Sequence, residues 1–273
     1  MPRAETLRSR ANPLYKRLRA LKERAGEREL CLLEGPRLVL EALEAGLAVV
    51  EAAASERAES SPAGPAALAA LRQSGVPVRA MSAELVASLS ETETSQGVLA
   101  LARRPSFPEE GMFEGTPLVL VADGVQDPGN LGGLLRTAEA AGASGAILAL
   151  GCADAFSWKA LRGSMGSAFR VPHLRGVSIE QALDALDARR IPVLATAPDG
   201  ERRYDEVDLR GPVAVVVGAE GAGLAAAVLE RATARLRIPL SGAVESLNVG
   251  VAAALVLFEA ARQRGFARLG PGE

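Results

Sequence analysis

The apolar positions in the second half of the chain form short uninterrupted runs, separated by stretches with helical spacing. Runs of this kind are typical of parallel strands that are buried on both faces. The alternation of such strands with helices predicts an α/β domain with a parallel sheet. We expect strands at 118–122, 146–150, 192–196 and 213–217, and helices at 131–141, 180–189, 224–231 and 246–264.

The first hundred residues also alternate, but their apolar runs are shorter. Leu14, Leu18 and Leu21 recur at helical spacing and predict a helix over 13–24. Ser82 before an apolar stretch is typical of a helix N-terminus. We expect further helices at 37–45, 65–73 and 82–89, and strands at 30–33, 48–53, 76–78 and 98–101.

A segment without periodicity separates these two halves. It reads RRPSFPEEGMFEGTP over 103–117, and its three prolines and two glycines are typical of a linker. The sequence therefore predicts a smaller α/β domain at 1–103, a linker at 104–117 and a larger domain at 118–273.

Composition limits the classes of protein to consider. Hydrophobic residues make up 48% of the 273, so a sizeable core can form, although aromatic residues are only 3%. The two cysteines, Cys31 and Cys152, indicate neither a disulfide framework nor a metal cluster. The N-terminus has no apolar core of a signal peptide, and no apolar run reaches the length of a membrane span. We expect a cytoplasmic protein without membrane segments.

Charge is unevenly distributed. The net charge of −2 argues against binding nucleic acid through bulk charge alone. Residues 1–28, however, contain nine Lys and Arg against three Glu. Such a segment can contact RNA phosphates or can be a solvated helix face, and the charge pattern alone leaves both interpretations open.

Three loops of the second domain are rich in Gly, Asn, Ser, Glu and Pro, and each precedes a predicted helix. Ligands of parallel sheets bind at the carboxyl ends of strands, and glycine lets backbone approach a ligand closely. We therefore expect the three loops to converge on one site, although an ordinary strand-to-helix turn would also explain the second loop alone. The loops are DGVQDPGNLGGLLR at 123–136, GAEGAGL at 218–224 and IPLSGAVESLNV at 238–249.

Taken together, these loops resemble the SpoU (TrmH-like) branch of the SPOUT RNA ribose methyltransferases. The matching patterns are D-x-x-x-D-P-G-N-x-G-x-x-x-R-T-A at 123–138, G-x-E-G-x-G-L at 218–224 and I-P-x-x-x-x-x-E-S-L-N-V at 238–249, with a weaker match at 159–172. CLLEGPR at 31–37 and TETSQGV at 92–98 resemble the family's N-terminal extension, which is similar to a small ribosomal-protein-like α/β fold and is taken to bind RNA. The resemblance covers nearly the whole chain.

The resemblance implies a fold and a reaction. The second domain would be a SPOUT domain with a deep trefoil knot that brings 218–224 and 238–249 together. The family works as a homodimer with the last helix in the interface. Its reaction transfers a methyl group from S-adenosyl-L-methionine to a ribose 2′-hydroxyl of RNA, and the N-terminal extension favours large-subunit ribosomal RNA over transfer RNA.

The resemblance also assigns residues to catalysis. The guanidinium of Arg136 is a cation, so stabilising a developing alkoxide suits it better than acting as a base. Asn130 can orient the ribose or simply cap a helix. Glu245 fits a helix-start carboxylate better than a catalytic group. The residues assigned to catalysis are Asn130, Arg136, Glu220, Ser246 and Asn248.

The cofactor contacts implied by the resemblance are mostly to backbone or to small and apolar side chains. A slot between Ile238 and Leu247 suits adenine. The reaction requires no metal, and the chain's single histidine, His173, is interpreted as structural or solvent-facing. The residues placed around S-adenosyl-L-methionine are Thr196, Gly218, Glu220, Gly221, Ile238, Leu240 and Leu247.

Two other functions fit the sequence less well. A nucleotide-dependent oxidoreductase would need G-x-G-x-x-G after the first strand, which the sequence lacks. A methyltransferase that acts on a base is disfavoured by the D-P-G-N…R pattern. A methyltransferase of transfer RNA and a catalytically silent RNA-binding assembly factor stay open as alternatives.

Overall fold

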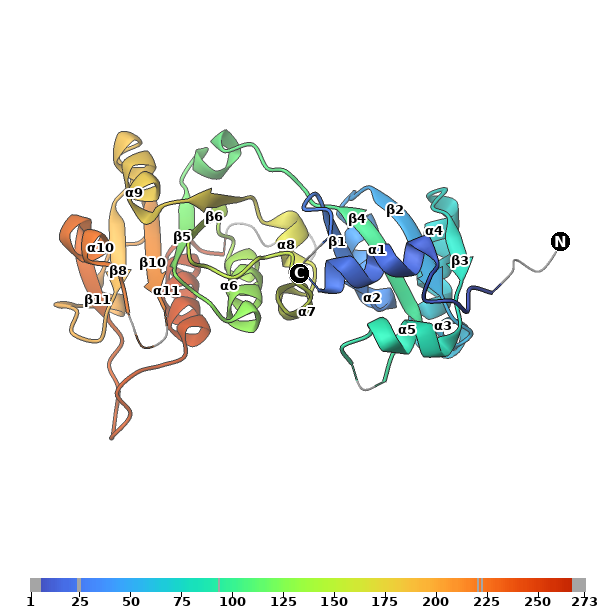
Figure 1. Ribbon diagram of the computed structural model, residues 1–273. Coiled ribbons are helices and arrows are strands. Elements are labelled where there is room, and N and C mark those ends of the chain that lie inside the picture. Colours follow the sequence, from blue (N-terminus) through green and yellow to red (C-terminus); the bar gives the residue numbers. More distant parts are fainter. Residues whose placement is uncertain (1–5, 24–25, 93, 220, 222, 267–273) are drawn as a thin grey trace. The chain divides into compact units, whose positions relative to one another are not determined.

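The computed structural model describes residues 6–23, 26–92, 94–219, 221 and 223–266. The chain divides into two compact units (Figure 1). The first contains Met1–Pro105 together with Phe156–Phe169, and the second contains Ser106–Ala155 together with Arg170–Glu273. The segment 156–169 therefore groups with the first unit, although it follows the predicted linker in sequence.

The first unit is a four-stranded sheet covered by helices. The strand order is β1-β4-β2-β3, with β4 antiparallel to both neighbours and β3 parallel to β2. Its core is formed by leucines of β1, β4, α1 and α5 with Met81. The strands are β1 (Leu30–Glu34), β2 (Val49–Ala54), β3 (Val78–Ala80) and β4 (Val98–Arg103). The helices are α1 (Pro13–Lys22), α2 (Pro36–Glu44), α3 (Arg57–Ser60), α4 (Gly64–Gln73), α5 (Ala83–Leu89), α7 (Trp158–Ser164) and α8 (Ser167–Arg170).

The second unit is built on a seven-stranded sheet in the order β7-β6-β5-β10-β8-β11-β9, in which every pair of neighbours is parallel. The predicted parallel α/β class is thus confirmed. The strands are β5 (Leu118–Asp123), β6 (Gly145–Ala149), β7 (His173–Val177), β8 (Val193–Thr196), β9 (Arg202–Arg203), β10 (Val213–Gly218) and β11 (Ala234–Arg237). The helices are α6 (Pro128–Ala140), α9 (Ile179–Ala188), α10 (Ala226–Arg231) and α11 (Val249–Gln263), with 3₁₀ turns at Glu110–Phe113 and Tyr204–Glu206.

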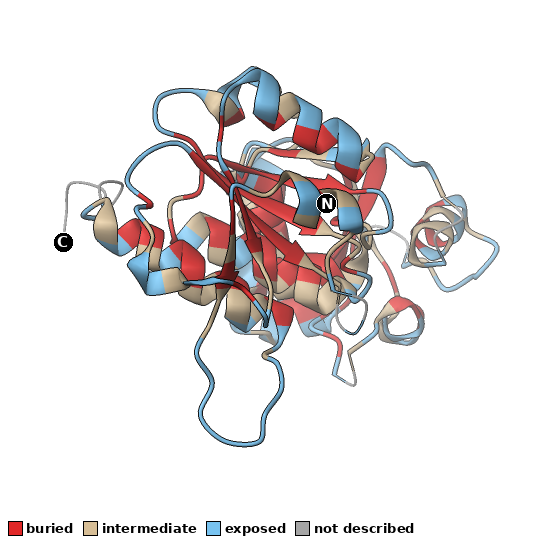
Figure 2. Cartoon of the chain, turned by 90° about the vertical axis from the view of Figure 1, so that its left-hand side faces the viewer, coloured by how far each residue is buried: buried red, intermediate tan, exposed pale blue. Residues whose placement is uncertain are grey.

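Helices cover both faces of this sheet, and its strands are buried between them (Figure 2). On one face α9 and α10 pack against alternate residues of β5, β6, β8 and β10. Helices α6 and α11 pack together, and α11 also lies against β10. After β5, the chain forms β6 and β7 on one side of this strand. The later strands β10 and β8 lie on its other side, so the order of strands reverses at β5. Ligands of open parallel sheets bind at such a reversal, beyond the carboxyl ends of the strands.

Among the differences from the expected elements, two concern the last helix and the linker. The last helix begins at Val249 and not at residue 246, because Asn248 is its N-cap and 246–248 are non-helical. The predicted linker contains one ordered turn, Glu110–Phe113, whose Met112 is fully buried next to Gly145. Within the described residues, no helix combines the length and apolar character needed to cross a membrane.

Candidate functional site

A cavity of about 490 Å³ lies where β8, β10 and β11 end. Its walls come from the turn after β8, the glycine loop after β10 and the long segment between β11 and α11. That last segment projects from the second unit and is almost wholly exposed along its outer part (Figure 2). Of the predicted cofactor residues, those that line this cavity are Thr196, Gly218, Gly221, Ile238, Leu240 and Leu247. Glu220 lies outside the described residues.

The glycine loop brings backbone, rather than side chains, to the cavity. Ala219 and Gly223 exchange two backbone hydrogen bonds of 3.1 and 3.0 Å, which close a tight turn. Gly221 and Gly223 have φ of +89° and +70°, which side-chain-bearing residues rarely adopt. A Cβ on Gly218 would lie only 2.4 Å from the carbonyl oxygen of Gly223. Glycine is therefore needed at 218 for the loop to close.

Two polar side chains anchor the strands under the cavity. Asp123 ends β5, and its Oδ2 accepts a 2.8 Å hydrogen bond from the backbone N–H of Ala225, which precedes α10. The Thr196 hydroxyl donates to the carbonyl of Val216 at 3.0 Å and so ties β8 to β10. Asp123 thus has a positioning role that the sequence pattern alone did not assign to it.

Asn130 and Asn248 meet although they are 118 residues apart. The Asn248 Oδ1 accepts from the backbone N–H groups of Gly250 and Val251 at 2.9 and 3.4 Å, which caps α11. Its Nδ2 then donates to Asn130 Oδ1 at 3.1 Å. Because only the amide oxygen can accept from the helix N–H groups, the capping bonds determine which way the amide is turned.

Asn130 itself does not cap a helix, contrary to one expectation. The N-cap of α6 is Asp127, whose carboxylate accepts from the Asn130 backbone N–H at 2.9 Å. Asn130 is therefore in the first turn of α6, and its side chain points to Asn248. Glu245 is likewise not at a helix start, because α11 begins four residues later; it lines the cavity instead.

The remaining predicted catalytic residues are distributed unevenly. Ser246 and Asn248 line the cavity, and Asn130 joins them through its hydrogen bond to Asn248. Arg136 is exposed on α6, six residues after Asn130, and lines neither this cavity nor the groove described next. The structure thus gathers three of the four described candidates.

An open groove of about 550 Å³ runs between α6 and α11. Its floor is formed by small residues, among them Gly133 and Ala254, and its rim carries Val251 and Phe258, which are 48% and 42% exposed. Asn130 and Asn248 also line it, so the groove adjoins the polar corner of the cavity.

Sequence reasoning missed several lining residues of the cavity. Ala197 and Pro198 directly follow β8, and Ala252 lies in the first turn of α11. The position of the first two after a buried parallel strand was a signal that could have identified them.

Neither His173 nor Cys152 has the environment of a catalytic group. His173 is buried, its Nδ1 lies 2.9 Å from the carbonyl of Val171, and its ring packs on Phe107 at 5.0 Å between centroids. Burial lowers the pKa of His173 to about 4, so the imidazole is neutral near pH 7. Burial raises the pKa of the Cys152 thiol, which donates to the Ala122 carbonyl at 3.3 Å. Among the residues that the structure describes, His, Cys, Asp and Glu form no cluster able to hold a metal ion.

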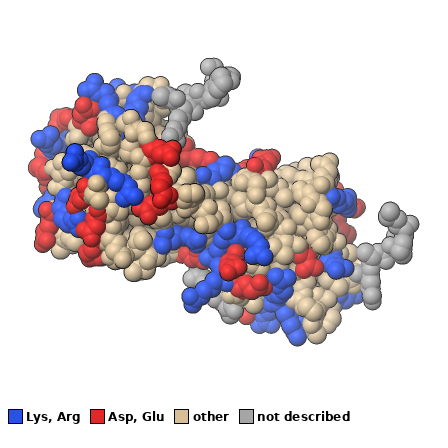
Figure 3. All heavy atoms as spheres, turned by 90° about the horizontal axis from the view of Figure 1, so that it is seen from above, with Lys and Arg blue, Asp and Glu red and all other residues tan. Residues whose placement is uncertain are grey.

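Part of the basic N-terminal segment is occupied by ion pairs. Arg19 pairs with Glu23 at 2.7 Å, and Arg17 pairs with Glu27 at 3.0 Å. Lys and Arg alternate with Asp and Glu over the face shown in Figure 3, without one continuous basic surface. These pairs favour the solvated-helix interpretation for this part of α1. Arg3 and Arg24 lie outside the described residues.

Comparison with known proteins agrees with this geometry. Residues 117–258 match the SpoU rRNA Methylase family, and residues 12–100 match the MRM3-like substrate binding domain. The chain is 36% identical to the 23S rRNA (guanosine(2553)-2'-O)-methyltransferase RlmP of Bacillus subtilis (strain 168) over 94% of this chain and 98% of that protein.

Two solved structures are similar over almost the full length. A crystal structure of an RNA 2'-O ribose methyltransferase has a TM-score of 0.80 at 38% identity and covers 95% of this chain and 99% of that chain. The SpoU methyltransferase AviRb from Streptomyces viridochromogenes, in complex with AdoMet, has a TM-score of 0.83 at 30% identity and covers 93% of this chain and 98% of that chain.

Proposed function

The chain belongs to the SpoU rRNA methylase family, and on that basis we propose that it methylates a ribose 2′-hydroxyl of large-subunit ribosomal RNA with S-adenosyl-L-methionine as the donor. The observation that carries the proposal is that two of the family's three motif loops, 218–224 and 238–249, line one cavity. The third loop is linked to it through the hydrogen bond of Asn130 to Asn248, which lines the cavity.

The cavity fits the cofactor in size and chemistry. Its volume of about 490 Å³ is within the range usual for ligands of this size. Ile238, Leu240 and Leu247 offer an apolar slot for adenine, and Gly218 and Gly221 offer backbone that no side chain covers. When bound there, S-adenosyl-L-methionine supplies an electrophilic methyl group. Thr196 and Glu220 complete the proposed cofactor contacts.

On the substrate side, we assign positioning to the linked asparagines and charge stabilisation to Arg136. Asn248 holds the Asn130 side chain through its Nδ2, so the orientation of both amides depends on the cap of α11. Asn130 orients the ribose, and Ser246 shapes the pocket beside it. The Arg136 guanidinium carries a positive charge and stabilises the negative charge that develops on the 2′-oxygen. Glu220 orients Asn130 or the substrate.

The RNA is held in part by the first unit. Residues 12–100 match a substrate binding domain, which supports binding of RNA outside the methyl-transfer cavity. We propose that the RNA-binding domain spans 1–103, that 104–117 is a linker, and that 118–273 is the methyltransferase domain. Because RlmP and similar relatives modify 23S rRNA, we place the activity in the cytoplasm and favour ribosomal over transfer RNA.

We further propose that a second copy covers the groove between α6 and α11. Val251 and Phe258 are exposed apolar side chains at the rim of this groove. Their burial in a homodimer would remove apolar surface from water. A homodimer would also enclose Asn130 and Asn248, which line the same groove. The trefoil knot belongs to this proposal as well, supported by loops 218–224 and 238–249 lining one cavity.

The decisive experiment measures transfer of tritiated methyl groups from S-adenosyl-L-methionine to unmodified ribosomal and transfer RNA. Labelled nucleotides are mapped by nuclease digestion, and resistance of the labelled site to alkaline cleavage identifies a 2′-O-methyl group. Asn130→Ala and Arg136→Ala are assayed in parallel. Arg210→Ala is the control, because this exposed arginine precedes β10, at the end of the strand away from the cavity.

We expect label at one nucleotide of 23S rRNA, retained by Arg210→Ala and lost in both site variants. Label in transfer RNA would replace the substrate that we propose. Absence of transfer to every RNA, including assembling subunits, with cofactor still bound would support the catalytically silent RNA-binding factor instead.

A further inference from the structure

A second pocket, of about 260 Å³, lies within the first unit. Its lining residues lie in or next to 31–37, 92–98 and 159–172, the segments that carried the family resemblance outside the cofactor loops, and all of them belong to the first unit. Helix α7 belongs to the same compact unit as α2 and the loop before β4. The lining residues are Glu34, Gly35, Arg37, Leu38, Glu41, Thr92, Thr94, Gln96, Trp158, Leu161, Arg162 and Met165.

One wall of this pocket is aromatic and cationic. Trp158, the only tryptophan of the chain, is half-buried at the start of α7. The Arg162 guanidinium lies one turn further along the helix, 5.5 Å from the centre of the indole ring. Leu161 is buried behind them. The indole is thus partly accessible beside an arginine and can present an aromatic face to a ligand.

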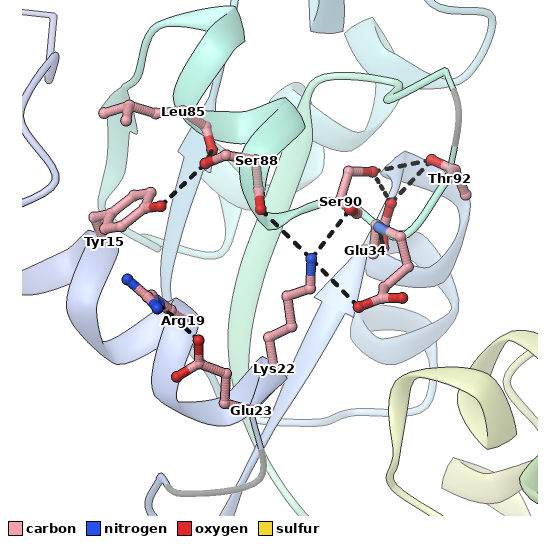
Figure 4. Close-up of polar contacts among 10 residues, drawn as sticks. Tyr15, Arg19, Lys22, Glu23, Glu34, Leu85, Ser88, Ser90 and Thr92 are labelled. Carbon is pink, nitrogen blue, oxygen red and sulfur yellow. Dashed lines mark hydrogen bonds and ion pairs between the residues drawn. The ribbon is translucent and has the colours of Figure 1, made fainter.

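Another part of the lining, at Thr92, is held in place by Glu34 (Figure 4). Its carboxylate accepts hydrogen bonds from the Ser90 hydroxyl, the Thr92 hydroxyl at 3.0 Å and the Glu91 backbone N–H at 3.2 Å. Lys22 clamps the same loop from outside, donating to the Ser90 carbonyl at 3.2 Å and pairing with Glu91 at 3.3 Å. Residues 90–92 are thus tied to the end of β1 without a ligand, and Glu34 acts as a positioning residue.

Polar groups line the rest of the pocket. Arg37 is exposed in the first turn of α2 and supplies a positive charge at the mouth. Thr94 and Gln96 supply hydrogen-bonding groups that suit a base edge. The Glu34 carboxylate accepts hydrogen bonds from residues 90–92. These bonds offset part of its negative charge, so it repels a phosphate in the pocket less strongly.

We propose that this pocket binds one unpaired nucleotide of the RNA substrate, with its base stacked on Trp158 beside Arg162 and its phosphate bound by Arg37. Proteins that recognise single-stranded RNA stack splayed bases on aromatic rings and arginine planes and hydrogen-bond the base edges. A volume of about 260 Å³ is below the range of pockets for drug-sized ligands and suits one base. The inference rests on the proposed function, because it takes RNA as the substrate.

Because Trp158 is the only tryptophan, its intrinsic fluorescence reports on this pocket directly. The wild-type protein is titrated with unmodified 23S rRNA transcript, and with a fully double-stranded RNA as the comparison. N-acetyltryptophanamide corrects for absorption by RNA, and filter retention measures binding independently. We expect saturable quenching with the transcript and little with the duplex. RNA binding without a change in Trp158 fluorescence would overturn the proposal.

Substitutions then separate stacking from structure. Trp158→Leu removes the ring on which the base stacks, so it should raise the KM for RNA roughly 10- to 100-fold. The KM for S-adenosyl-L-methionine and kcat should change little, and Trp158→Phe should restore most of the affinity. Arg162→Ala should also raise the KM for RNA.

The chain offers a matched control in the second unit. Arg189 lies 4.3 Å from the centre of the Phe113 ring, an arginine–aromatic pair like that of Arg162 and Trp158 but outside the pocket. Phe113→Leu and Arg189→Ala should leave the KM for RNA unchanged. An unchanged KM for RNA in Trp158→Leu, with methylation intact, overturns the nucleotide pocket and leaves the proposed function standing. Absence of methylation in the wild type contradicts the proposed function itself.

Discussion

The pocket of the second unit is formed mainly by backbone, whereas the pocket of the first unit is formed mainly by side chains. In the second unit, the cavity depends on backbone: Gly218 approaches the Gly223 carbonyl, and the turn between them needs glycine. In the first unit, the pocket depends on side chains, with Trp158 and Arg162 in one part of the lining and a loop held by Glu34 in another. A backbone-built site tolerates almost no added atom, whereas a side-chain-built site should lose affinity by degrees. Substitutions in the two units should therefore differ in size and in the ligand they affect.

The largest effect is expected for Gly218→Ala. The new Cβ would lie 2.4 Å from the Gly223 oxygen and 2.5 Å from its carbonyl carbon, and backbone cannot move aside as a flexible side chain can. Overpacking of this kind costs about 3 kcal/mol, so affinity for S-adenosyl-L-methionine should fall about 100-fold by isothermal titration calorimetry. Gly211→Ala is the control, because a Cβ there meets nothing within 4 Å. Equal cofactor affinity in Gly218→Ala and the wild type would contradict the importance of the backbone cradle.

A pH effect should come next, and it should come from the second unit alone. The chain's single histidine, His173, lies there, and burial lowers its pKa from the usual 6.5 to about 4. A histidine whose pKa is lower in the folded state binds fewer protons there than when unfolded. The stabilisation is present above the unfolded pKa and is lost as pH falls from about 6.5 towards 4.

The loss should be about 2 kcal/mol of unfolding free energy between about pH 7 and about pH 5, measured by denaturant titration. His173→Gln, which cannot take up a proton, should flatten this part of the pH profile. A profile that keeps its slope in His173→Gln would assign the effect to other groups.

Asn248 should separate stability from catalysis. Asn248→Ala removes both the cap of α11 and the bond to Asn130, so we expect a loss of about 1 kcal/mol in unfolding free energy together with a lower kcat. Asn248→Asp keeps an oxygen that caps the helix but lacks the Nδ2 donor. It should keep most of the stability and still lose kcat, as measured by thermal unfolding and methyl transfer. If both variants lost stability equally and kept kcat, the Asn130–Asn248 bond would have no role in the reaction.

How far the sequence predicted this structure depended on the length of each apolar run. The central strands β5, β8 and β10 were predicted within one or two residues because their runs are long and buried. Strand β11, whose sequence is ARLR, was not predicted because it is short and half polar. The predicted start of the last helix was three residues too early. The prediction followed the apolar spacing and did not use the preference of Asn248 for the N-cap position.

The site, too, could be predicted from the sequence in part and not in full. Convergence of the glycine-rich loops followed from the rule for parallel sheets, and the cavity is lined by residues of two of them. The hydrogen bond between Asn130 and Asn248 could not be predicted, because a contact between residues so distant in sequence depends on how α6 and α11 pack. The grouping of 156–169 with the first unit was equally inaccessible, and with it the pocket around Trp158.

The smallest effect is expected for Glu34→Gln, and this variant tests most directly whether the pockets of the two units are independent. The amide keeps the shape of the side chain but has one accepting oxygen in place of two, so at least one of the three donors that Glu34 now satisfies loses its partner. We expect the loop at 90–92 to loosen, with RNA affinity about 3-fold weaker, since a single hydrogen bond contributes on the order of 1 kcal/mol. The affinity for S-adenosyl-L-methionine should not change, because Glu34 is in the first unit and the cavity is in the second. Filter binding of RNA and calorimetry of the cofactor measure the two affinities on the same preparation. A parallel fall in both would show that the two pockets are energetically coupled, and the separation drawn between backbone-built and side-chain-built sites would then fail.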